Sequence, residues 1–103
     1  MDAAERFDGV VASFVRKPGV ETGRIFGSLG LKRSGKTFAM FVKGRLVVKL
    51  PRERVEELVA ADVGQPFDPG HGRLMREWLA VDPAADVDWA ELSREAHAFL
   101  CGR

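Results

Sequence analysis

The chain has 103 residues, with 16 Lys and Arg against 15 Asp and Glu and a formal net charge of +1 at pH 7. This length predicts one domain, residues 1–103, and is too short for most nucleotide-hydrolysing or two-domain catalytic architectures. The N-terminus has no apolar run behind a basic start, and no segment approaches the roughly 18 apolar residues of a membrane span. We therefore expect a cytoplasmic protein with no membrane insertion.

The first predicted element is an N-terminal helix. Apolar residues recur at i, i+3, i+4 and i+7 from Phe7 to Phe14, which is typical of one side of a helix. Pro18 prevents the helix from continuing beyond Lys17. We expect this apolar side to pack in the core.

Three strands joined by two tight turns follow the helix. The pattern predicts strands over residues 24–31, 37–43 and 46–50. Ser34-Gly35 and Gly44-Arg45 are typical of two-residue hairpin loops. The middle of the chain is therefore predicted to be an antiparallel meander.

The register implied by these turns gives the sheet two apolar faces. One face holds Ala39, Phe41, Leu46, Val48 and Leu50. The other holds Leu31, Phe38, Met40, Val42 and Val47, and is edged by Arg33, Lys36 and Lys49. Antiparallel sheets commonly bury one face and leave the other in water. Two apolar faces therefore predict helices on one face and another cover on the second, for which a second copy in a homodimer is economical.

A second helix is predicted to begin after Pro51, because proline is tolerated in the first turn, and to end at Gly64. Residues 65–72 are predicted to be a loop. The segment 74–79 has helical spacing, although residues 78–81 would also fit a strand, and periodicity alone favours the helix.

A C-terminal helix is the last predicted element. Asp88 and Glu91 have the spacing of a capping box at its start, and Gly102 marks its end. Cys101, the single cysteine of the chain, excludes an internal disulfide and is interpreted as a small apolar filler.

Short sequence phrases occur in one order along nearly the whole chain. They are RIFG (24–27), GKTFA (35–39), GRLVVKLP (44–51), PF (66–67), RLM (73–75) and EWLAV (77–81). Their order and spacing resemble the TfoX/Sxy N-terminal domain. The resemblance implies an α+β fold in which helices pack on one face of an antiparallel sheet of about four strands. It also implies that residues 75–81 are a strand, which we adopt over the helical spacing.

The resemblance also implies a class of function. Full-length family members are linked to competence gene regulation and carry a second, helical C-terminal domain, whereas we expect this chain to be a standalone N-terminal domain. The family offers no catalytic residues to carry over. We therefore expect a non-enzymatic regulatory or accessory binding module, with no cofactor and no small-molecule substrate.

One motif raises an alternative function. Residues 30–37, Gly-Leu-Lys-Arg-Ser-Gly-Lys-Thr, satisfy the phosphate-loop pattern, which would make the protein a nucleotide-binding enzyme. A phosphate loop needs a helix N-terminus directly after it, but residues 38–42 have the composition of a strand. We predict a hairpin here, and the test is whether Thr37 begins a strand or a helix.

Other residue types with reactive side chains give no site. His71 lies between two glycines and His97 on the last predicted helix, and neither has the paired spacing of a metal site or an evident nucleophilic partner. We predict no catalytic residues, no cofactor-binding residues and no metal ligands.

Positive charge is segregated in the predicted sheet. Between Thr22 and Arg52 the chain has eight basic residues and no Asp or Glu. The candidate partner surface consists of Arg24, Lys32, Arg33, Lys36, Phe38, Met40, Arg45 and Lys49. Because strands alternate side chains between two faces, we expect these cations to crowd onto a small area.

Three functions are compatible with this surface. The cations could contact nucleic acid phosphates while Phe38 stacks on a base, and six phosphate contacts would give a log–log salt slope near −5. An acidic protein is the second candidate partner. The third interpretation is a purely structural dimerisation domain, in which solvated cations discourage strand edges from aggregating.

Overall fold

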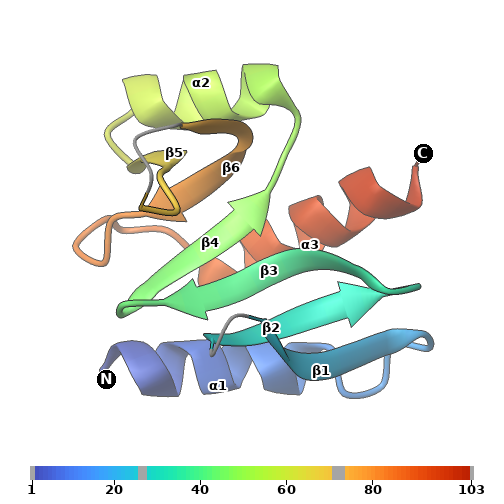
Figure 1. Cartoon of the computed structure of the whole chain (residues 1–103). Coiled ribbons are helices and arrows are strands. Elements are labelled where there is room, and N and C mark those ends of the chain that lie inside the picture. Colours follow the sequence, from blue (N-terminus) through green and yellow to red (C-terminus); the bar gives the residue numbers. More distant parts are fainter. Residues whose placement is uncertain (1, 26–27, 71–73, 103) are drawn as a thin grey trace.

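The computed structural model describes residues 2–25, 28–70 and 74–102 (Figure 1). In chain order its elements are α1 (Ala3–Ser13), β1 (Val20–Ile25), β2 (Ser28–Arg33), β3 (Lys36–Val42), β4 (Arg45–Lys49), α2 (Arg52–Ala60), β5 (Gly64–Phe67), β6 (Met75–Val81) and α3 (Trp89–Cys101). The α+β prediction is confirmed, including the strand over residues 75–81. None of these helices is long and apolar enough to cross a membrane.

The sheet has six antiparallel strands in the order β1-β2-β3-β4-β6-β5, two more than predicted. The predicted strand over residues 24–31 is wrong, because the chain reverses between Ile25 and Ser28, which pair with each other. Gly27 was the turn signal in that segment, whereas Gly23 and Gly30 pair with each other inside β1 and β2. Residues 26 and 27 lie outside the described residues.

The second additional strand, β5, occupies part of the predicted loop 65–72. It is a short edge strand that contains Pro66, and proline is tolerated at sheet edges because its missing N–H faces away from the ladder. Helix α2 ends before it, at Ala60, and Asp62 rather than Gly64 takes the left-handed conformation after the helix, with φ of 61°.

Both predicted hairpins form, with one correction. Ser34 and Gly35 have φ of 53° and 76°, and Lys43 and Gly44 have φ of 51° and 80°. Two consecutive positive φ angles are typical of type I′ turns, which match the twist of the strands they join. The second loop is therefore Lys43-Gly44, not Gly44-Arg45, and Arg45 is already paired with Val42 in the sheet.

The first of these hairpins answers the phosphate-loop question. Gly30 and Leu31 lie inside β2, and Lys36 and Thr37 lie at the start of β3. A strand therefore follows the motif where a phosphate loop requires a helix N-terminus. The hairpin prediction is confirmed.

A β-bulge at Phe38 changes the predicted faces of β3. Lys32 pairs with Thr37, but the next residue, Leu31, pairs with Ala39, so Phe38 is an extra residue. An extra residue interrupts the alternation, and Phe38 and Ala39 are both fully buried on the helix side. The predicted placement of Leu31 and Phe38 on the second face is wrong, since turn spacing does not reveal a bulge.

The helices cover the face that holds Ala39, Phe41, Leu46, Val48 and Leu50. These residues join one apolar cluster with buried side chains of all three helices. Phe7 of α1 stacks on Phe41 with ring centres 5.3 Å apart, and Phe14, at the C-cap of α1, lies 5.3 Å from Phe38. In Figure 1, α1 and α2 lie at opposite ends of the curved sheet, and α3 runs behind its centre.

Candidate anion-binding site

The structure divides the predicted cationic surface between two ends of the sheet. Arg33, Lys36 and Lys49 come together at the end that carries the β2–β3 turn. Arg45 lies at the opposite end beside the β3–β4 turn, and Arg24 lies at that end next to the β1–β2 reversal. The expectation of one crowded cationic area is therefore wrong, because cations that are near each other in the sequence lie at opposite ends of the hairpin strands, and hence of the sheet.

Lys32 lies apart from both groups, on the sheet face away from the helices. Its side chain extends across Gly23 of the neighbouring strand, where a Cβ atom would lie 3.7 Å from Lys32 Cε. Glu21 is its cross-strand partner on β1. This cation is therefore partly offset by a carboxylate.

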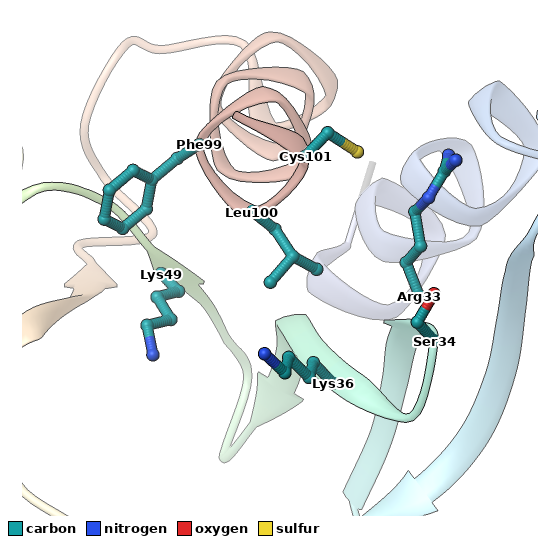
Figure 2. Close-up of a pocket in the computed structure, with 7 residues that line it drawn as sticks. All are labelled: Arg33, Ser34, Lys36, Lys49, Phe99, Leu100 and Cys101. Atoms are coloured by element: carbon teal, nitrogen blue, oxygen red, sulfur yellow. The ribbon is translucent and has the colours of Figure 1, made fainter. Parts of the chain in front are cut away.

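The first group lines a pocket at the C-terminal end of α3, which we call the basic pocket (Figure 2). Its volume is about 360 Å³. It is lined by Arg33, Ser34, Lys36, Lys49, Phe99, Leu100 and Cys101. Figure 2 shows Leu100 pointing from the helix into the space bounded by the three cations. The pocket combines an apolar floor with a charged rim.

Arg33 is the most firmly held of the three cations. Its Nη1 donates to the carbonyl of Pro18 at 3.2 Å and to Nε2 of His97 at 3.1 Å. Burial lowers the pKa of His97, and the positive charges of Arg33 and Lys17 lower it further. His97 is therefore a neutral acceptor, and it fixes the guanidinium without adding charge.

Cys101 lies beside the same histidine. Its Sγ is 3.5 Å from His97 Nε2, and the thiol is exposed at the rim of the basic pocket. The interpretation of Cys101 as a small apolar filler is therefore wrong, because the residue lies at the exposed end of α3. Phe99 and Leu100, which are half-buried, supply the apolar contacts there.

The basic pocket carries a net positive charge. Neither Lys36 nor Lys49 forms an ion pair with a described carboxylate, whereas Arg52, Arg54 and Arg94 on the helices all do. The C-terminus of α3 contributes a partial charge of about −0.5. Three unit positive charges exceed that partial charge, so the pocket attracts anions.

The two apolar members of the predicted surface have different positions. Phe38 is 0 % exposed and packs between Phe14 and His97, so it cannot stack on a base. Met40 does lie on the helix-free face, beside Trp78.

Trp78 is the aromatic residue that the sequence interpretation missed. Lys49 Nζ lies 5.8 Å from the centre of its ring, because Lys49 and Trp78 are cross-strand partners on β4 and β6. The pairing of β4 with β6 brings Trp78 next to Lys49, and residue spacing in the sequence does not reveal this pairing. Trp78 is half-buried and presents an aromatic surface next to the basic pocket.

The described residues provide no metal-binding group. No three His, Cys, Asp or Glu side chains gather within residues 2–25, 28–70 and 74–102. His71 lies outside the described residues. What the site can do chemically is hold an anion by charge and hydrogen bonds.

These features define a class of protein, a small α+β domain with a cation-lined pocket at one end of its sheet. The TfoX N-terminal domain family matches residues 12–99, and the chain belongs to this family. It is not a known enzyme family, and membership fits a regulatory module without enzymatic activity. No curated protein and no solved structure matches the chain.

Proposed function

We propose that this domain is a regulatory binding module that holds the phosphate backbone of nucleic acid in its basic pocket. The observation that carries the proposal is the grouping of Arg33, Lys36 and Lys49 around one pocket with no described carboxylate paired to either lysine. Phosphate contacts from Lys and Arg supply most of the sequence-independent affinity for nucleic acid.

The surroundings of the pocket determine what kind of binding it supports. Helix α3 presents its C-terminus to the pocket, so this helix is not placed to read base edges in a groove. Trp78 and Met40 continue the surface beyond Lys49, where an unpaired base could stack. The proposal is therefore binding with little sequence preference and with a preference for exposed bases.

The salt dependence follows from the number of cations. Three phosphate contacts give a log–log salt slope of about −2.7 on duplex DNA, smaller than the slope expected from six contacts. Affinity should fall roughly 40-fold between about 50 and 200 mM salt. A slope near zero would contradict phosphate binding.

The experiment is a fluorescence anisotropy titration with labelled single-stranded and duplex oligonucleotides. Reversing the pocket charges in Lys36→Glu/Lys49→Glu should weaken binding about tenfold or more. The matched control is Lys43→Glu/Arg45→Glu, which makes the same charge change at the opposite end of β3 and β4 and should leave most of the affinity. Equal losses in both variants, or no complex with either oligonucleotide at low salt, would overturn the proposal.

The stability of the same variants must be measured as well. Cations near a helix C-terminus stabilise it by about 0.3–1 kcal/mol, and this could be the whole role of Lys36 and Lys49. That structural role predicts a lower Tm for Lys36→Glu/Lys49→Glu with no complex formed by the wild type. Binding by the wild type together with its loss in the folded variant supports the proposed function instead.

A further inference from the structure

The sheet face opposite the helices carries a second surface, which adjoins the basic pocket at Lys49 and Trp78. Two adjoining hollows of about 500 and 550 Å³ lie on it, and Val42, Lys43, Phe67 and Pro69 line both. Together they form one groove, which we call the open-face groove. Its apolar residues include Met40, Val42, Val47, Phe67, Trp78 and Ala80.

The apolar lining of this groove is contiguous rather than scattered. Val47 and Ala80 are cross-strand partners that form its buried floor, and the half-buried Met40 pairs with Val47 from the next strand. Leu74 and Met75 at its edge are 54 % and 39 % exposed. The accessible apolar surface is therefore supplied by the half-buried residues Met40, Val42, Phe67 and Trp78 together with Leu74 and Met75, and an apolar patch of this kind marks an interaction site in soluble proteins.

The charged groups around the groove are mainly positive. Lys43 and Arg45 line it at the β3–β4 turn, and Lys49 lies over Trp78 at the other end. Asp68 is the described carboxylate in the lining, and its Oδ1 accepts a hydrogen bond from the backbone N–H of Gly70 at 2.8 Å. An occupant that complements this groove is apolar along its centre and acidic along its edges.

We propose that the open-face groove binds an acidic amphipathic segment of a partner protein. Apolar side chains of the segment would pack on Met40, Phe67 and Trp78, and its carboxylates would pair with Lys43 and Arg45. A face-to-face homodimer is the competing occupant, but it would bring the cationic rims of two identical copies together. Charge complementarity therefore favours a different, acidic chain.

The probe is a set of peptides selected for binding from a random 16-residue phage library. We expect the selected peptides to combine apolar residues at i, i+3 or i+4 and i+7 with flanking Asp and Glu. On titration into isotope-labelled protein, they should shift the backbone amide signals of Met40, Val47 and Ala80. Peptides without acidic residues, or shifts confined to other elements, would overturn the proposal.

Charge variants separate this proposal from the proposed function. Lys43→Glu/Arg45→Glu should lower the affinity for the selected peptides about tenfold or more. Arg16→Glu/Lys36→Glu makes the same charge change away from the groove and should leave that affinity unchanged. The effects on oligonucleotide binding should be the reverse, so either proposal can fail alone. The groove proposal would also be overturned if no peptide binder could be selected. A concentration-dependent dimer in analytical ultracentrifugation that Met40→Asp abolishes would overturn it as well.

Discussion

The bulge in β3 makes a quantitative prediction about Phe38. This side chain is 0 % exposed, and its ring centre lies 5.3 Å from Phe14 and 5.2 Å from His97. Truncating a buried Phe to Ala costs about 3–5 kcal/mol, because the apolar contacts are lost and a cavity remains. A domain of this size has a free energy of unfolding of about 5–15 kcal/mol, so Phe38→Ala should remove a large share of it.

The matched control is Met40→Ala on the same strand. Met40 is half-buried on the helix-free face, so its truncation should cost about 1 kcal/mol, near half the value of a fully buried side chain. Urea unfolding followed by circular dichroism measures both variants. If Phe38→Ala does not fold, Phe38→Leu should still fold with a cost of up to about 1.5 kcal/mol.

The result that would refute this reasoning is an equal loss of stability in Phe38→Ala and Met40→Ala. Without the bulge, the two residues would lie on one face and would have similar surroundings. On the Tm scale, Phe38→Ala should lower the midpoint by at least about 12 °C and Met40→Ala by about 4–8 °C.

Three further predictions concern stability and pH. The pKa of His97 is lowered by burial and by Arg33, so the unfolded chain binds more protons than the folded chain just below pH 6.5, and the stability of the domain should fall as pH decreases through that range. His97→Gln should remove this pH dependence in urea unfolding measured between about pH 5 and 8, and an unchanged pH dependence would contradict the assignment. Gly64→Ala should destabilise the domain by about 1–3 kcal/mol in thermal unfolding, because the added Cβ would clash with the backbone carbonyl oxygen of Ala80. Gly9→Ala on the exposed side of α1 should instead stabilise it by about 0.5–1 kcal/mol, and effects of the same sign would be inconsistent with this packing. Asp88→Ala should lower the free energy of unfolding by about 0.5–2 kcal/mol, because the Asp88 carboxylate accepts hydrogen bonds from the backbone N–H groups of Ala90 and Glu91. An Asp88→Asn variant that is equally unstable would argue against this capping role.

The strands and turns with strong local signals were predictable from the sequence. Both hairpin turns contain glycine at a position that needs positive φ, and Pro51 and Asp88 mark helix starts as local steric and hydrogen-bonding preferences require. These signals depend on residues within a few positions of each other, so spacing alone reveals them.

Features set by non-local pairing were not predictable in the same way. The bulge at Phe38 depends on how Leu31 and Ala39 pair across two strands. The adjacency of Lys49 and Trp78 depends on β6 entering the sheet beside β4, thirty residues along the chain. Arg33, Lys36 and Lys49 were predicted to edge one face, and in the structure they line one pocket. The contribution of α3 to this pocket had no local signal in the sequence.

The measurement that tests the central claim most directly is chemical-shift mapping of the isotope-labelled domain with a single-stranded oligonucleotide at low salt. The account predicts that amide signals of Ser34, Lys36, Lys49 and Leu100 move together, with the side-chain signal of Trp78. It also predicts that the shifts shrink as salt increases. Shifts confined to Lys43 and Arg45, or shifts that do not depend on salt, would contradict phosphate binding in the basic pocket.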